Sequence, residues 1–312
     1  MNTFGTRFRL TAFGESHGTA IGGVIDGCPA GLTLDSDFIA AEMTRRHLGS
    51  DATPRREADR VEWLSGLYEG RTLGTPLAFL IANGEQRSED YASLSALCRP
   101  GHADYTYLKR YGLRDPRGGG RASGRETAVR VAAGAVAKLL LRNRQIEIGS
   151  RVMEPVAPAD NDSCGGIIEC VVTGLPAGIG DPLFDKLNAR LAAAMMSIPS
   201  ATGFEVGEGF DAARMAGSQY RDEWNAAAPD GTITTKTNHC GGIQGGISNG
   251  MPVVFRTAFH AVTTLPRPTA CLADDGSLQT ITPAGRHDRN HIPRTAVVVE
   301  AMCALVLADL IY

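Results

Sequence analysis

The chain has 312 residues, of which 43% are hydrophobic and 21% charged, so it can bury a substantial core and is too apolar to be disordered. Its net charge of −3 excludes a global attraction to nucleic acid or to anionic membranes. Any anion-binding site must therefore be local, on a globular protein of one large domain or two ordinary ones.

The seven cysteines predict a reducing environment. They are odd in number, form no C-x-x-C pair and mostly lie in apolar or glycine-rich runs, which favours buried thiols over disulfides or a zinc site. The first residues contain no apolar signal segment, and no apolar run reaches the roughly 20 residues of a membrane span. We expect a cytoplasmic protein with no bound metal and no membrane partner.

The first strand, residues 8–13, ends in a turn that holds acid–base side chains. This turn is Gly14-Glu15-Ser16-His17-Gly18, and turns at strand ends often carry functional residues. A lone histidine is more often structural, so His17 requires partners elsewhere in the chain. A helix capped by Asp35 or Ser36 then runs to about Leu48 and ends in Arg45-Arg46-His47.

Two later loops carry the partners that His17 requires. Residues 99–104 read Arg-Pro-Gly-His-Ala-Asp and place His102 in a Pro/Gly-punctuated loop. Residues 285–288 read Gly-Arg-His-Asp and precede the last helix. A glycine-rich run over 238–250 is too irregular for a dinucleotide fingerprint and lacks the P-loop lysine, although it permits close approach of a ligand.

The stretch from Asp115 to Thr127 predicts an anion cradle. It packs three arginines and four glycines ahead of a helix start. Glycines expose successive N–H groups, and guanidinium groups grip phosphate or carboxylate oxygens in pairs. Ser123 and Glu126 have the spacing of a capping box, and the helix dipole that follows adds attraction for anions. In isolation the same pattern also fits a helix cap with surface arginines.

Two helices with apolar residues on nearly every side predict the architecture. They span about 127–141 and 295–310, and both are too short for a bilayer. We expect an α+β fold in which these buried core helices are sandwiched between two antiparallel sheets.

The chain also repeats two patterns in the same order. Residues 23–31 are echoed by 170–178, and residues 74–79 by 250–255. These echoes suggest an internal duplication, with pseudo-repeats of about 8–145 and 165–312, although chance matches of Gly and Pro turns would look the same.

Together, the turn at His17, the loop at His102, the Asp115–Thr127 stretch and the 285–288 loop resemble the chorismate synthase family. The resemblance runs from the N-terminus to the last helix and implies a single domain over 1–312 in a homotetramer. It implies the anti-1,4-elimination of phosphate from 5-enolpyruvylshikimate 3-phosphate, giving chorismate, the last step of the shikimate pathway. The reaction requires reduced FMN but involves no net redox change.

The resemblance also implies roles for particular residues. His17 and His102 match the two proton-handling histidines, and Asp288 matches a carboxylate that faces the flavin. The positions that match substrate contacts are Arg46, Arg99, Ser123, Arg125 and Arg286. The positions that match flavin contacts are Arg121, Ala122, Ser123, Ser200, Ala201, Gly245, His260, Ala261, Val262, Thr263, Thr264 and Arg286.

The chain departs from the family pattern at four places. A further arginine expected after Arg46 falls on residues 50–52, so that Arg55 or Arg56 would have to replace it. The Lys-Pro-Thr-Ser-Ser flavin segment is His-Ala-Val-Thr-Thr over 260–264, and the Pro-Cys after the 285–288 loop is Arg289-Asn290. The segment between Gln145 and Gly165 is also shorter than usual.

Two other functions fit parts of the sequence. An FMN-dependent reductase could use the same cradle, but no nucleotide fingerprint is visible for the nicotinamide that it would need. An RGG-like nucleic-acid segment would need a basic domain with stacking aromatic residues, whereas this chain is acidic and has no aromatic residue between Asp115 and Thr127.

Overall fold

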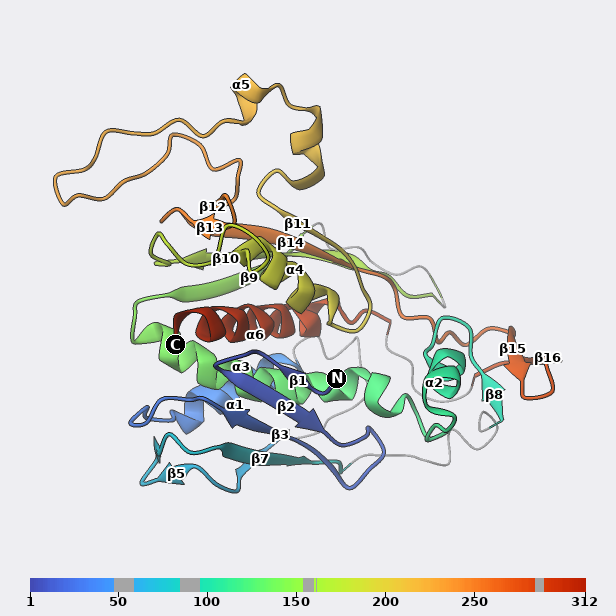
Figure 1. Cartoon of the computed structure of the whole chain (residues 1–312). Coiled ribbons are helices and arrows are strands. Elements are labelled where there is room, and N and C mark those ends of the chain that lie inside the picture. Colours follow the sequence, from blue (N-terminus) through green and yellow to red (C-terminus); the bar gives the residue numbers. More distant parts are fainter. Residues whose placement is uncertain (48–58, 85–95, 154–159, 161, 284–288) are drawn as a thin grey trace.

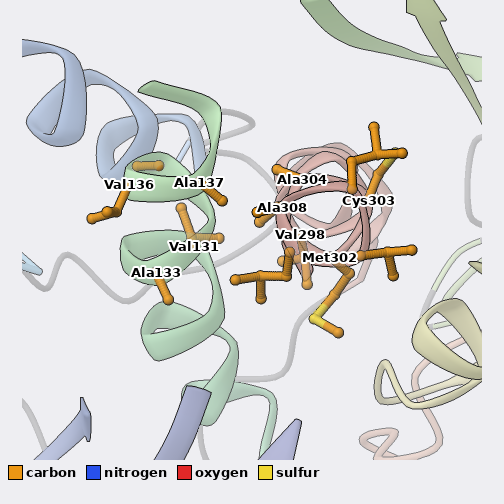
Figure 2. Packing of buried hydrophobic residues seen from close by; sticks show 14 of the residues in the cluster. Val131, Ala133, Val136, Ala137, Val298, Met302, Cys303, Ala304 and Ala308 are labelled. Carbon is orange, nitrogen blue, oxygen red and sulfur yellow. The ribbon is translucent and has the colours of Figure 1, made fainter. Parts of the chain in front are cut away.

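Two helices that are apolar on almost every side form the centre of the protein (Figure 1). The computed structural model describes residues 1–47, 59–84, 96–153, 160, 162–283 and 289–312. Within them, α3 (Thr127–Arg142) and α6 (Ile292–Ile311) are buried along most of their length. Gly134 of α3 lies so close to α6 that an added Cβ would stand 2.4 Å from the Ala301 Cβ. Figure 2 shows the small and branched side chains of both helices that pack in this region.

A five-stranded antiparallel sheet covers one side of the helix pair. Leu77, Phe79 and Ile81 alternate along one of its strands with more exposed residues and are completely buried, which is the period of a strand with one face on the core. A Cβ added to Gly23 would lie 2.8 Å from Val129 of α3, so the sheet packs directly on that helix. In spatial order the strands are β1 (Thr3–Phe4), β2 (Arg9–Phe13), β3 (Ala20–Asp26), β7 (Leu77–Ala82) and β4 (Val61–Trp63).

A four-stranded antiparallel sheet covers the other side. Val253, Phe255 and Phe259 are buried at alternate positions of one strand, and α6 packs on this sheet. Figure 1 shows α3 and α6 lying between the two sheets. The predicted combination of helices with antiparallel sheets is therefore confirmed. In spatial order the strands are β11 (Ala201–Val206), β14 (Val253–Phe259), β10 (Gly166–Thr173) and β9 (Glu147–Met153).

The remaining described elements are short and lie around this core. The helix α1 (Ser36–Arg45) packs on α3, and α4 (Leu187–Met196) packs on α6 and β11. In the described part of the chain, every helix is too short or too polar to cross a membrane. The other elements are β5 (Leu67–Tyr68), β6 (Arg71–Thr72), β8 (Leu97–Cys98), α2 (Asp104–Tyr111), η2 (Gly120–Ala122), η3 (Gly124–Glu126), η4 (Gly209–Arg214), α5 (Gly217–Tyr220), β12 (Ile243–Gln244), β13 (Ile247–Ser248), β15 (Thr269–Ala273) and β16 (Leu278–Ile281).

One of the two predicted helix caps forms differently. Asp35 caps α1 as expected, since its Oδ1 accepts from the Phe38 N–H at 2.9 Å. The capping box predicted at Ser123 is wrong. Ser123 Oγ accepts from the Arg125 N–H at 3.3 Å and starts the 3-10 turn η3, while the Glu126 carboxylate pairs with Arg130 at 3.0 Å. An extra turn therefore separates Ser123 from the first residue of α3.

The two halves of the chain contain the same local hydrogen bonds. In the first half, Thr72 Oγ1 accepts from the Leu32 N–H at 3.0 Å and donates to the Pro29 carbonyl at 2.6 Å. In the second half, Ser248 Oγ accepts from the Ile179 N–H at 2.9 Å and donates to the Pro176 carbonyl at 2.6 Å. In both halves the hydroxyl comes from a short hairpin, β5–β6 or β12–β13.

We expect Gly134→Ala to destabilise the protein, although alanine is the better helix former by about 1 kcal/mol. The added methyl group would lie 2.4 Å from Ala301 Cβ and 2.5 Å from its Cα, so the two helices would have to separate. Overpacking of this kind costs about 1–3 kcal/mol in the free energy of unfolding. The midpoint of chemical denaturation measures the effect.

The matched control is Gly149→Ala on β9, where an added Cβ meets nothing within 4 Å. Its midpoint should stay close to that of the unmodified protein. A midpoint for Gly134→Ala at or above this control would show that the α3–α6 contact is not tightly packed.

Candidate active site

A cavity of about 710 Å³ lies at the N-terminal ends of the two core helices. Thr127 at the start of α3 lines it, together with Arg294 and Thr295 in the first turn of α6. Figure 1 shows both helices running in the same direction, with their first turns toward the side that holds α2. Since the N-terminus of a helix carries partial positive charge, two such ends at one cavity favour an anionic ligand.

The described wall of the cavity carries more positive than negative side chains. Six arginines and three carboxylate residues line it. A chain with a net charge of −3 thus concentrates positive charge at one place, which attracts anions locally. The arginines are Arg46, Arg99, Arg114, Arg117, Arg121 and Arg294, and the carboxylate residues are Glu15, Asp104 and Asp115.

The predicted cradle forms one side of the cavity. Gly118 and Gly120 line it with left-handed backbone, at φ values of +67° and +52°, which glycine adopts without steric cost. Arg121 Nη2 donates to the Ala12 carbonyl at 3.1 Å, and the Ser16 N–H donates to the Gly120 carbonyl at 3.3 Å. These bonds join the cradle to the end of β2 and to the turn that follows it.

His17 lies directly behind the cradle. Its side chain is buried, and a Cβ added to Gly118 would stand 2.8 Å from His17 Nε2. A side chain at position 118 would therefore collide with the imidazole. The structure places His17 beside the cavity wall, with the backbone of Gly118 in contact with the ring.

His102 lines the cavity in a hydrogen-bonded and neutral state. Its Nδ1 lies 3.0 Å from the Pro100 carbonyl, to which it donates, so Nε2 accepts from the Thr264 hydroxyl at 2.8 Å. Burial lowers the pKa of His102 below its usual value of 6.5, and the charge of Arg99 lowers it further. Near pH 7 the ring is therefore an uncharged hydrogen-bond acceptor.

Arg99 connects the His102 loop to the cradle. Its Nε donates to Asp104 Oδ2 at 2.8 Å and its Nη2 to the Gly118 carbonyl at 3.2 Å. Although burial acts in the opposite direction, the bonds from Arg99 hold the pKa of Asp104 below its ordinary value. The guanidinium is thus held by an ionised carboxylate before any ligand binds.

The structure separates Arg46 from Arg125, although both positions match substrate contacts of the family. Arg46 lines the cavity, whereas Arg125 is buried behind it. Both guanidinium groups bond to the carboxylate of Asp59. Ser123 also falls outside the lining, because it is used to begin η3.

Most of the positions expected to contact the flavin lie at or beside the cavity, whereas Gly245 does not. Arg121, Ala122, Ser200, His260, Val262 and Thr263 line the cavity, and Ala201, Ala261 and Thr264 adjoin them in the chain. Gly245 occupies the turn between β12 and β13 with open space around it, and Figure 1 places that hairpin far from α2. Arg286 and Asp288 lie outside the described residues, as do Arg55 and Arg56.

Several residues of the described cavity wall were missed from the sequence, including the arginines Arg114 and Arg294. His291 precedes α6, and its Nε2 lies 2.9 Å from Ser200 Oγ. Tyr107 of α2 also lines the cavity. The signal for His291 was its place two residues before Pro293 at a helix start, where side chains face the end of the helix.

A cavity that joins two helix N-termini, clustered arginines and a neutral histidine defines an enzyme site for small substrates with several negative charges. A sequence profile of the family described as chorismate synthase matches residues 8–159 and 155–312.

Known proteins agree with this assignment. The chain is 48% identical over 350 residues to the chorismate synthase of Porphyromonas gingivalis. The alignment covers 99% of this chain and 95% of that protein. It is 45% identical over 349 residues to that of Methanocella arvoryzae, with coverages of 99% and 93%. A solved structure entitled "Crystal Structure of Chorismate Synthase" superposes with a TM-score of 0.75 at 30% identity and covers 98% of this chain and 92% of that one. The chain belongs to the chorismate synthase family.

We expect the imidazole of His102 to titrate below pH 6.5 in the free protein, because of its burial and of Arg99. Unfolding returns the pKa to about 6.5, so the unfolded state binds more protons just below that pH. His102 therefore lowers the free energy of unfolding as the pH falls from 7 toward 5 and has no such effect above pH 7. An NMR titration of the imidazole signals, assigned with His102→Gln, measures the midpoint.

The matched variant is Thr264→Val, which removes the hydroxyl that donates to the neutral Nε2. Because that bond favours the neutral ring, the variant should titrate at a higher pH than the unmodified protein. A midpoint at or above 6.5 in the unmodified protein would contradict the assignment of a neutral His102.

Proposed function

We propose that this protein is a lyase that eliminates phosphate from 5-enolpyruvylshikimate 3-phosphate in the anti-1,4 sense and gives chorismate, with reduced FMN as the cofactor. The observation that carries the proposal is the arginine-lined cavity at the N-termini of α3 and α6, in a member of the chorismate synthase family. The substrate carries one phosphate and two carboxylates, and FMN adds a second phosphate. A positively charged cavity offsets this accumulation of negative charge.

In this proposal the substrate is held by arginines on several loops. Arg46 and Arg99 line the cavity with their guanidinium groups already oriented by Asp59 and Asp104, so little reorganisation is needed on binding. Ser123 and Arg125 support this wall from behind, and we assign Arg286 to the same anion by its match to the family.

Two histidines are assigned to the protons of the reaction. The Nε2 of His102 accepts from the Thr264 hydroxyl at the cavity, and its Nδ1–H is fixed on the Pro100 carbonyl. His17 lies behind Gly118, and we assign it to a proton of the reaction by its match to the family. Histidine suits both positions because small changes in its surroundings make it a donor or an acceptor near pH 7. We assign Asp288 to the flavin side of the site by its match to the family.

The cavity residues fit a bound flavin phosphate. Gly118 and Gly120 present left-handed backbone at the wall, a conformation that exposes N–H groups to anions. We propose that FMN is held by Arg121, Ala122 and Ser123 on one side and by Ser200, Ala201, the segment 260–264 and Arg286 on the other. When bound, reduced FMN supplies an electron-rich ring beside the substrate. The position of Gly245 does not support its contact with FMN in the same chain.

We also propose a homotetramer in the cytoplasm. A segment from η4 to β12 projects from the body in Figure 1 and carries exposed apolar side chains, including Phe210 and Trp224. Apolar side chains on a projecting segment favour association with another subunit. None of the seven cysteines, which all lie in the described part of the chain, forms a disulfide, as is typical of a reducing compartment.

The chain is further proposed to be one domain, 1–312, built by internal duplication. The matching bonds of Thr72 and Ser248 support it, because each hydroxyl joins a hairpin to the same Pro-Ala-Gly turn of its half. The sheet orders β2–β3–β7 and β9–β10–β14 correspond as well.

Anaerobic incubation with 5-enolpyruvylshikimate 3-phosphate tests the function. We expect release of inorganic phosphate and formation of chorismate only when reduced FMN is present, because the flavin is required without being consumed. Oxidised FMN is the matched control and should give no product. Oxidation of a nicotinamide in step with flavin reduction, without phosphate release, would instead support the FMN-dependent reductase.

His260 provides a test of the flavin position. Its exposed imidazole stands where the family pattern has lysine, whose ammonium group is a permanent positive charge at neutral pH. If His260 contacts the FMN phosphate, His260→Lys should bind FMN about two- to fivefold more tightly than the unmodified protein. Titration by flavin fluorescence measures the affinity.

The control is His239→Lys on the projecting segment, where the imidazole bonds to Glu208 at 2.8 Å and does not line the cavity. It should leave FMN affinity unchanged. Equal FMN affinities of the unmodified protein and of His260→Lys would mean that position 260 does not touch the cofactor.

A further inference from the structure

Asp59 is a buried carboxylate at the centre of the arginines behind the cavity. Its side chain is 0% exposed, and its two oxygens are bonded to different guanidinium groups, Oδ2 to Arg46 and Oδ1 to Arg125. His47 Nε2 lies 3.2 Å from Oδ2. The backbone of Asp59 is left-handed, at φ +42°, a strained conformation that persists where the surroundings enforce it and that is frequent at functional sites.

The bond to Arg46 reaches the cavity directly. Arg46 lines the cavity, and its Nη2 donates to Thr127 Oγ1 at 3.2 Å at the first residue of α3. Burial lowers the pKa of Arg46 to about 10, which still leaves it charged at neutral pH. A buried guanidinium needs a carboxylate close by, and Asp59 fixes the direction in which Arg46 points.

The bond to Arg125 leads to the turn that carries His17. Arg125 Nε donates to Asn83 Oδ1 at 2.9 Å, and its Nη2 donates to the Ala82 carbonyl at 3.1 Å. Asn83 Nδ2 in turn donates to the carbonyls of Glu15 at 3.1 Å and Gly18 at 2.9 Å, on the two sides of His17. A continuous set of hydrogen bonds thus joins the cavity arginine to the histidine turn.

The bonds of Asn83 specify an amide at that position. Its oxygen accepts from a guanidinium while its nitrogen donates to two carbonyls, and the side chain is buried. A carboxylate there could accept from Arg125 but could not donate to the turn. The connection between the two halves of the network can therefore be cut without removing the acceptor for Arg125.

We propose that Asp59 is a positioning residue of the reaction, which holds Arg46 toward the substrate and, through Arg125 and Asn83, sets the position of the His17 turn. This inference rests on the proposed function. It assigns Arg125 an indirect role, since its guanidinium is engaged behind the wall. Preorganised groups of this kind accelerate a reaction because they need not reorient when charge develops.

The test compares Asp59→Asn with Asp59→Glu in the phosphate-release assay. Asparagine keeps the shape and removes the charge, so we expect a rise in KM from the loosened Arg46 and a fall in kcat from the displaced His17 turn. Loss of one partner of a buried charge pair predicts a drop in kcat/KM of about tenfold or more. Asp59→Glu keeps the negative charge, so it should retain part of the kcat/KM that Asp59→Asn loses.

Asn83→Asp is the second variant and separates the two ends of the network. It keeps an acceptor for Arg125 but loses both donations to the turn, so kcat should fall while KM changes little. This variant also tests the inference if Asp59→Asn does not fold.

The matched control is Asp309→Asn at the far end of α6. Asp309 is also a buried carboxylate with an arginine partner, Arg190, but its other bonds go to the N–H groups of residues 6–8. The Asp309→Asn variant should have a lower free energy of unfolding, and the kcat/KM of the folded protein should stay unchanged.

Several outcomes would overturn the inference. One is unchanged kinetics in Asp59→Asn, and another is a lower KM with an unchanged kcat in that variant. A third is a loss of kcat/KM in Asp309→Asn as large as the loss in Asp59→Asn. If the unmodified protein releases no phosphate, the proposed function has failed, and the His17 imidazole signals still test the network. These signals should shift in Asp59→Asn and Asn83→Asp but not in Asp309→Asn, and unshifted signals would refute the connection.

Discussion

The close packing of α3 against α6 determines where chemistry can occur in this protein. Gly134 lets the helices approach, and both helices begin at the same end of the core. The positive ends of their dipoles then lie at one cavity and add to the positive potential of its side chains. The two sheets bury the outer faces of the helix pair, so the open end of the core is the place where loops from both halves can meet.

The arginines at this end are held before a ligand arrives. Arg99 is paired with Asp104, and Arg46 with Asp59. Each carboxylate reduces the cost of burying a guanidinium, which would otherwise be high. The described wall still has more arginines than carboxylates, and that excess attracts a ligand with several negative charges. The paired carboxylates therefore orient the arginine side chains, and the excess of arginines attracts the anionic ligand.

The two histidines assigned to proton transfer occupy different surroundings. His102 is neutral at the cavity because of burial and the charge of Arg99, and Thr264 donates to its Nε2. His17 is enclosed behind Gly118 by a turn that Asn83 holds. The two rings therefore differ in their access to the cavity, since His102 lines it and His17 lies behind its wall.

The sequence by itself determined the elements and the family. The apolar helices, the Gly/Arg stretch and the loops of His17 and His102 all depend on local composition, so they were recognised along the chain. Tertiary structure decided which side chains meet. Arg125 lies three residues beyond Ala122, which lines the cavity, but Arg125 faces away from the cavity toward Asp59 and Asn83. The direction of a side chain depends on partners many positions away, such as Asp59 for Arg125, and these lie beyond any local pattern.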